Sequence, residues 1–167
     1  LGYLEGGGMI ILPEPQALLT RNSKMPGLDG RKMSKSYGNT IPLRAEPEQV
    51  SQQIKTMPTD PARVRRTDPG DPAKCPVWQL HLVYSDNEIQ QWVQSGCKQA
   101  SMGCLECKQP VIDAINEELA PIRERAARYI DDPGLVRTIV ADGCEAARDV
   151  ARETMEEVRS AMGLDYR

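Results

Sequence analysis

Apolar side chains recur at helical spacing through most of the chain, with prolines and aspartates where the helices should begin. Val50, Ile54 and Met57 lie three or four residues apart and predict a helix over residues 47–57, with a proline in its first turn. Residues 77–84 form a second apolar segment of helical length. The pattern therefore predicts a mainly α-helical fold.

Three further helices follow in the second half of the chain. Asp86 is a good N-cap for a helix to about Gln99. Pro110 can open the next helix, which Pro121 should kink or split, and an Asp-Pro pair precedes a last helix to about Met162. The inward faces predicted for these helices are Ile89, Trp92 and Val93; Val111, Ile112, Ile115, Leu119, Ile122, Ala126 and Tyr129 with Ile130; and Leu135, Val136, Ile139, Val140, Cys144, Ala147, Ala151, Met155 and Val158. We interpret the last stripe as core packing, with Cys144 as a small buried hydrophobe.

Two short apolar runs near the start of the chain have strand rather than helix character. They are Met9–Leu12 and Gln16–Thr20, bounded by prolines. Two strands of this length cannot form a stable sheet alone, so we expect them to be a short β remnant of a larger sheet. The following loop, residues 21–41, would then lie beyond the carboxyl ends of the strands, where ligands bind in open α/β folds.

Composition narrows the class of protein. The chain has 167 residues, 40% of them hydrophobic but none of them Phe, so the core must consist of aliphatic side chains, which suits helix packing. There is no apolar run long enough for a membrane span and no signal-like N-terminus, which points to the cytoplasm and to no membrane partner. Residues 1–74 hold 11 Lys and Arg against 8 Asp and Glu, whereas residues 75–167 hold 10 against 16. A phosphate-binding surface is therefore expected to be local. Because the chain starts at Leu1 rather than Met, we expect a fragment or a processed piece.

Cationic and hydroxyl side chains are concentrated in one loop, with the sequence Arg31-Lys-Met-Ser-Lys-Ser-Tyr-Gly-Asn39. It places two ammonium groups, at Lys32 and Lys35, beside the hydroxyls of Ser34 and Ser36. Cations and hydroxyl donors on a mobile loop can bind a polyphosphate. On composition alone, a solvated surface loop is the simpler interpretation.

A second candidate is a set of four cysteines, Cys75, Cys97, Cys104 and Cys107, spaced C-x21-C-x6-C-x2-C. A C-x-x-C pair in a tight turn can clamp one metal centre, and two more thiolates complete a four-sulfur set. Spacing alone favours zinc, and reduced, unligated core cysteines are the alternative. Disulfides are less expected because nothing points to secretion.

The remaining polar positions are less specific. A proline-rich connector over residues 58–76 carries Arg63, Arg65 and Arg66, which suit either a solvated loop or contacts with a tRNA backbone. The only histidine, His81, lies in an apolar helical context and is expected to be a satisfied core or edge residue. No serine–histidine–acid set, H-E-x-x-H motif or G-x-x-x-x-G-K-[ST] loop is present in the sequence.

The loop string Lys32-Met-Ser-Lys-Ser36 resembles the signature loop of class I aminoacyl-tRNA synthetases, and its approach, Lys24-Met-Pro-Gly-Leu-Asp-Gly30, resembles the tryptophan-specific branch. The resemblance runs from about Ile11 to the C-terminus. It implies activation of tryptophan with ATP and Mg²⁺ and transfer to tRNA(Trp). Lys32 and Lys35 would stabilise charge as pyrophosphate leaves, Ser34 and Ser36 would donate to phosphate oxygens or hold the loop, and the Met33 backbone would lie near the adenine.

The cysteine segment is similar to the motif of those bacterial tryptophanyl-tRNA synthetases that carry a [4Fe-4S] cluster, although the first gap is one residue shorter than in that motif. The resemblance implies a cluster on Cys75, Cys97, Cys104 and Cys107, with Zn²⁺ as the alternative metal. It would shape a tRNA contact, and electron transfer is an open alternative.

The resemblance also implies a division into the end of the catalytic nucleotide-binding domain (1–45), a helix with a connector (46–76) and a helical anticodon-binding domain (77–167). The full-length family is typically a homodimer. No H-I-G-H-type motif occurs in this sequence, so we expect the chain alone not to activate tryptophan. A non-catalytic helical metal module that binds tRNA or a partner, and a zinc-stabilised structural fragment, are the alternatives.

Overall fold

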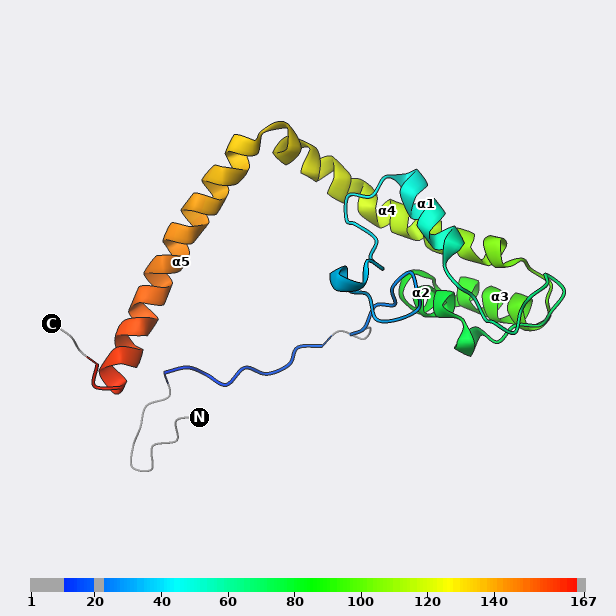
Figure 1. Cartoon of the computed structure of the whole chain (residues 1–167), viewed down its shortest axis with the longest axis horizontal. Helices are drawn as coiled ribbons and strands as arrows, with labels where there is room; N and C mark the ends of the chain where they lie inside the picture. The colour runs from blue at the N-terminus through cyan, green and yellow to red at the C-terminus, as the bar shows by residue number, and fades with distance from the viewer. Residues whose placement is uncertain (1–10, 20–22, 165–167) are drawn as a thin grey trace, which may run out of the picture. The chain divides into compact units, whose positions relative to one another are not determined.

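A computed structural model describes residues 11–19 and 23–164, and its ordered elements are helical (Figure 1). They are the 3₁₀ helix η1 (Lys35–Tyr37), α1 (Pro47–Thr56), the 3₁₀ helix η2 (Pro72–Lys74), α2 (Pro76–Tyr84), α3 (Asn87–Lys98), α4 (Cys104–Asp131) and α5 (Pro133–Ala161). The predicted mainly α-helical class is confirmed. The chain divides into two compact units, of which one spans Leu19–Ala127 and the other contains Arg128–Arg167.

The predicted β remnant is absent from the part of the chain that the structure describes. Residues 16–19 carry no strand, and most of the first predicted strand lies outside the described residues together with Thr20. A strand needs a neighbouring strand to pair its backbone groups, and residues 11–19 and 23–164 offer none. β-type pairing there is limited to one isolated antiparallel bridge, between Pro26 and Lys32.

The main core of the unit Leu19–Ala127 forms where α1 and α2 pack on the first half of α4; α1 lies alongside α4 in Figure 1. Val50 and Ile54 of α1 are fully buried, as their spacing predicts, and Met57 follows them into the core. Proline at the first position of α1 supplies a φ angle suited to a helix start. The other buried core residues are Ala45, Val77, Leu80, Val111, Ile112, Ile115 and Leu119.

A smaller core joins α2 to α3 through Trp78, Val93 and Met102. Asp86 caps α3 as predicted, because its carboxylate accepts the Ile89 N–H at 2.8 Å. Trp92, which was expected to face inward, is 45% exposed, so that part of the prediction is wrong. Its position on α3 lies outside the face that Val93 buries.

Helix α4 differs from its prediction at both prolines. It begins at Cys104 rather than at Pro110, since Glu106 reaches back to accept the Gly103 N–H and so caps the first turn. It also continues through Pro121 without splitting. Close to that proline, Arg123 donates to the carbonyls of Asn116 and Ala45, which ties the helix to the segment before α1.

Helix α5 forms as predicted, with the Asp132 carboxylate accepting the Leu135 N–H, but it contains no buried residue. The interpretation of its apolar stripe as core packing is therefore wrong for the described residues. Val140 is 58% exposed, and Cys144 is exposed rather than buried. An amphipathic stripe becomes core only where another element covers it. None of the helices within residues 11–19 and 23–164 is long and apolar enough to cross a membrane.

Candidate phosphate-binding loop and cysteine cavity

The loop over residues 25–39, called the hairpin below, carries the two candidate lysines: its chain doubles back over residues 25–33 and continues into η1, which begins at Lys35. The Met33 N–H donates to the Met25 carbonyl at 2.8 Å, and the Gly27 N–H donates to the Arg31 carbonyl at 2.6 Å. These two bonds flank the bridge between Pro26 and Lys32. Residues 25–33 therefore have a defined shape before any ligand binds.

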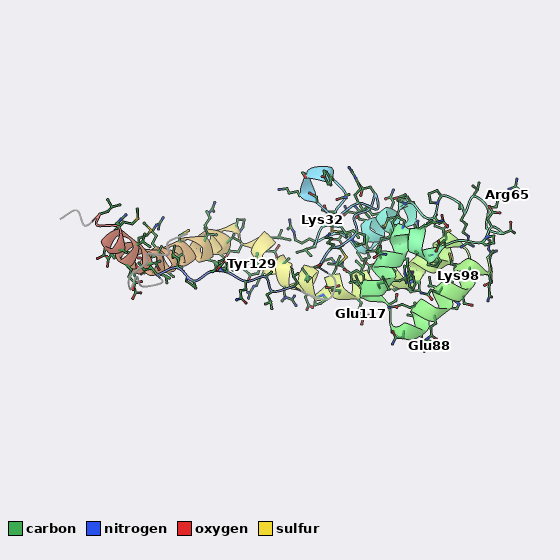
Figure 2. The ribbon with its side chains drawn as sticks, turned by 90° about the horizontal axis from the view of Figure 1, so that it is seen from below. Lys32, Arg65, Glu88, Lys98, Glu117 and Tyr129 are labelled. Carbon is green, nitrogen blue, oxygen red and sulfur yellow. The ribbon has the colours of Figure 1, made fainter. Side chains whose placement is uncertain are left out.

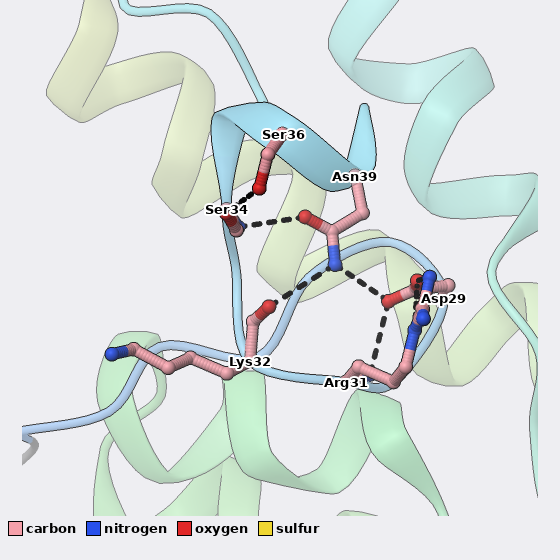
Figure 3. A network of polar contacts seen from close by, with 6 residues as sticks. All are labelled: Asp29, Arg31, Lys32, Ser34, Ser36 and Asn39. Atoms are coloured by element: carbon pink, nitrogen blue, oxygen red, sulfur yellow. Dashed lines mark hydrogen bonds and ion pairs between the residues drawn. The ribbon is translucent and has the colours of Figure 1, made fainter.

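Asn39 links three residues of the hairpin through side-chain hydrogen bonds (Figure 3). Its side chain is 3% exposed and accepts the Ser34 N–H at 2.8 Å. The same amide donates to the Asp29 carboxylate at 2.7 Å and to the Lys32 carbonyl at 3.2 Å. A Cβ at Gly27 would lie 2.2 Å from the Asn39 amide nitrogen, so only glycine leaves room for this side chain.

Asp29 is the acidic member of this network. The hydrogen bond from Asn39, together with the bonds and charge of Arg31, lowers the pKa of Asp29 to about 2. Arg31 also pairs with this carboxylate at 2.7 Å and lies over the Tyr37 ring at 4.5 Å from its centroid. The approach to the signature string is thus bound to the string itself.

The side chains of Lys32 and Lys35 take no part in this network. Both are exposed, and neither forms an ion pair with a carboxylate of the described residues. Figure 3 shows the Lys32 side chain extending away from Asn39 and Asp29, and Figure 2 shows Lys32 on the outside of the chain. The hydroxyls of Ser34 and Ser36 lie 2.8 Å apart and can both reach an incoming oxygen. This arrangement can offer two cations and two hydroxyls to an anion from solution.

The four cysteines of the predicted metal set converge. Cys75, Cys97, Cys104 and Cys107 line one small cavity in the unit Leu19–Ala127, and none of them forms a disulfide. The connector, α3 and the start of α4 each contribute to it. A Cβ at Gly70 would lie 2.6 Å from the Cys97 sulfur, so the connector can pass this close only with a glycine.

Burial disfavours the thiolate form of two cysteines in this cavity, Cys97 and Cys107. Burial, followed by the neighbouring cysteine sulfurs, raises the pKa of Cys107 to about 12. Burial also raises the pKa of Cys97, against the charge of Arg63. Ligation would therefore require the charge of a metal to displace the protons.

The cavity measures about 20 Å³, which is room for about one water molecule. Among the described residues, no three Cys, His, Asp or Glu side chains are placed to ligate a single metal ion. The donor set nevertheless fits a thiolate-bound centre, since four free thiols share the cavity with Lys108 and Arg63, and the Nε atom of Arg63 is buried without a hydrogen-bond partner. Loading a centre would require the thiol side chains to move outward.

The three connector arginines, predicted together, separate in the structure. Arg63 is 8% exposed and lines the cysteine cavity. Arg65 and Arg66 are exposed, Arg65 at the outer edge of the connector (Figure 2) and Arg66 in a loose 3.9 Å pair with Glu106. The pattern of charges in the sequence could not distinguish them.

His81 is the satisfied core histidine that its context predicts. It is fully buried, with Nδ1 2.8 Å from the Ser85 hydroxyl and Nε2 3.0 Å from the Cys107 carbonyl. Burial lowers the pKa of His81. Its hydrogen bond with the Cys107 carbonyl joins α2 to the first turn of α4.

Sequence reasoning missed Asn39 and Lys108. Lys108 is 3% exposed and shares a helix face with the core residues Val111, Ile112 and Ile115, a spacing that could have marked it as buried. Asn39 follows directly on Gly38 at the end of the loop, and its position alone gave no signal.

Comparison with known proteins shows the family to which the chain is similar. The profile of the family described as "tRNA synthetases class I (W and Y)" matches residues 4–120. The tryptophan–tRNA ligase of Ralstonia nicotianae is 67% identical over 165 residues, which are 99% of this chain and 41% of that protein. The tryptophan–tRNA ligase of Thermotoga maritima is 48% identical over 157 residues, which are 93% of this chain and 48% of that protein.

Among solved structures, tryptophanyl-tRNA synthetase from Campylobacter jejuni, complexed with ADP and tryptophan, is similar with a TM-score of 0.67 and 27% identity. The likeness covers 84% of this chain and 44% of that one. The chain thus spans less than half the length of each of these three proteins.

Proposed function

The chain belongs to the class I tRNA synthetases for tryptophan and tyrosine, and from that premise we propose that it is part of a tryptophan–tRNA ligase. In the whole protein, ATP would activate tryptophan and the product would be transferred to tRNA(Trp). The observation that carries the proposal is the hairpin, which presents Lys32 and Lys35 free of acidic partners within the described residues. Tryptophan–tRNA ligases that match nearly the whole chain support it and do not favour a non-catalytic module.

The hairpin residues have separate roles in this proposal. Lys32 and Lys35 place cations where negative charge develops as pyrophosphate leaves, and Mg²⁺ accompanies the ATP. Ser34 and Ser36 donate to phosphate oxygens, and the Met33 backbone lies near the adenine. The support for these roles is the exposure of both lysines on a loop whose backbone is already held by Asn39.

The domain division of the sequence analysis stays part of the proposal. Residues 1–45 would be the end of the catalytic nucleotide-binding domain, and 46–76 a helix with its connector. Residues 77–167 would be the helical anticodon-binding domain. The whole protein would act in the cytoplasm as a homodimer. Arg65 and Arg66, which are exposed, are better placed than Arg63 for a tRNA backbone contact.

We also propose that Cys75, Cys97, Cys104 and Cys107 hold a [4Fe-4S] cluster, with Zn²⁺ as the alternative. The shared cavity supports a four-thiolate centre. The preference for the cluster over Zn²⁺ rests on the resemblance of the cysteine segment, because the small cavity and the placement of the sulfurs require the thiols to move for either centre. When bound, a cluster of this type would stabilise the helical unit and shape the surface near it.

The ligase proposal can be tested by exchanging this chain for the matching segment of the Ralstonia nicotianae enzyme. We expect the chimera to catalyse tryptophan-dependent ATP–pyrophosphate exchange and the isolated chain not to. Lys35→Ala in the chimera should lower the exchange rate by roughly 10²–10³-fold, the loss typical for a group that stabilises developing charge. A folded chimera without exchange activity would contradict the proposal, as would an undiminished rate in the Lys35 variant.

The nature of the centre can be tested separately by anaerobic purification. A brown protein with iron and sulfide supports the cluster, and a colourless protein with stoichiometric zinc supports the alternative. Protein without either metal, after expression with both supplied, would contradict the centre but leave the ligase proposal untouched.

A further inference from the structure

Two buried cations flank the cysteine cavity, and the proposed ligase chemistry uses neither. Lys108, directly after Cys107, is 3% exposed and lines the cavity. Its ammonium donates to the carbonyls of Lys55 at 2.8 Å and Met57 at 2.7 Å. These carbonyls end α1, where the helix dipole favours a cation, so Lys108 also joins α1 to the start of α4.

Arg63 reaches the cavity from the connector. One terminal nitrogen lies 3.8 Å from the Cys97 sulfur, and the other donates to the carbonyls of Arg66 and Met102. The Nε atom is buried and has no hydrogen-bond partner. An arginine this buried, with a donor left over, indicates that further acceptor atoms belong in the cavity.

The two cations have no direct ion-pair partner among the neighbouring carboxylates. Neither Arg63 nor Lys108 forms an ion pair within residues 11–19 and 23–164. Asp60 lines the same cavity, but its carboxylate is engaged by the Ala62 and Asp71 N–H groups. A single carboxylate, Asp60, leaves one of the two buried cations uncompensated, which is costly, so the arrangement suits a site that is anionic when filled.

We infer that Arg63 and Lys108 are the counter-charges of a net-negative, four-thiolate centre in this cavity. The inference rests on the proposed cysteine centre. Four thiolates bound to Zn²⁺ or to a [4Fe-4S]²⁺ core carry a net charge of −2, which the two cations would offset in either case. Their role is positioning and charge compensation, because neither cation can ligate the metal itself.

The experiment compares variants of the full chain that remove each charge with little loss of volume. Arg63→Met and Lys108→Met should release the bound metal to a chelator roughly 10- to 100-fold faster than the unmodified chain, the range seen when outer-shell partners of metal ligands are removed. For an iron–sulfur cluster, both variants should also have a more negative midpoint potential, since the reduced cluster carries the greater negative charge.

Three controls separate charge from fold. Lys98→Met removes an exposed lysine that directly follows Cys97, as Lys108 follows Cys107, and should leave the release rate unchanged. Lys108→Arg keeps the charge and should restore slow release. Arg63→Gln keeps a hydrogen-bond donor without the charge. If Lys108→Met fails to fold, the rate of metal release from Arg63→Gln tests the counter-charge role.

The outcomes distinguish failure of the counter-charge role from failure of the proposed cysteine metal centre. Metal-free wild-type protein would overturn the cysteine centre and this inference together. A metal-bound wild type whose folded Arg63→Met and Arg63→Gln variants release metal at the wild-type rate would overturn the counter-charge role alone.

Discussion

The hairpin and the cysteine cavity use positive charge in opposite ways. Lys32 and Lys35 are exposed and free of carboxylates among the described residues. Arg63 and Lys108 are buried and line the cavity that four thiols share. The first pair lies on a hairpin held by side-chain hydrogen bonds, and the second is built into the packing of helices.

This difference separates a site completed from outside from one completed within the fold. An exposed cation costs little to keep and is available to a ligand that diffuses in. A buried cation has to be compensated where it stands. The hairpin therefore resembles half of a binding site, whereas the cavity assembles all of its proposed ligands and counter-charges within the unit Leu19–Ala127.

Loss of one cysteine should produce the largest contrast between the two regions. Cys104→Ser removes one of four ligands, so we expect the bound metal to be lost and the helical unit to be destabilised by an amount on the order of several kcal/mol, because metal binding is coupled to folding. Metal analysis and thermal unfolding of the purified chain would measure both effects. Lys35→Ala, on the hairpin, is the matched control and should change neither quantity. Unchanged metal content in the cysteine variant would remove Cys104 from the ligand set.

Asn39→Ala should disorder the hairpin and leave the cavity intact. The variant leaves the Ser34 N–H without its acceptor and the Asp29 carboxylate without one of its donors. We expect a local loss of about 1–3 kcal/mol, seen as roughly 10- to 100-fold faster hydrogen exchange at the amides of residues 27, 33 and 34. Asn39→Gln is the stringent comparison, since it keeps the amide but makes the side chain too long for the space beside Gly27. Unaltered exchange in both variants would mean that the backbone bonds alone hold the hairpin.

The hairpin should also respond to acid through Asp29. Its pKa is lowered from 3.8 to about 2, so the ionised form is favoured in the folded hairpin. The stabilisation is present in full above pH 3.8 and is lost as the pH falls through 2. A pH titration of the Asn39 side-chain amide by NMR would follow this loss. The Asn39→Ala variant should shift the Asp29 titration toward its usual pKa.

Most helices could be predicted from the sequence because their signals are local. Apolar spacing, the first-turn proline Pro47 and the caps Asp86 and Asp132 mark the starts of α1, α3 and α5. The burial of the α5 stripe could not be predicted, since it depends on whether another element covers it. The start of α4 was missed because Glu106 caps the helix one turn before the proline that drew attention.

The candidate sites were predictable as sets of residues but not as geometry. The signature string located the lysines, and the cysteine spacing located the four thiols of the shared cavity. The burial of the Arg63 side chain depends on contacts with Met102 and Cys97, which are more than thirty positions away in the sequence. No periodicity within the connector could separate it from Arg65.

Substitution of Arg31 should have the smallest effect of the predicted changes. Arg31 is the arginine of the hairpin that can be compared with Arg63 in the cavity. It makes a 2.7 Å pair with Asp29 and lies over the Tyr37 ring, yet its side chain is 64% exposed. Exposed ion pairs and cation–π contacts contribute about 1 kcal/mol or less, so Arg31→Met should change hairpin hydrogen exchange by less than about tenfold and weaken further with added salt. Arg63→Met, the same substitution in the cavity, should have the larger effect on metal retention and on unfolding temperature. If the two arginine variants unfold at the same temperature, burial is not what separates the two regions, and the contrast drawn between them fails.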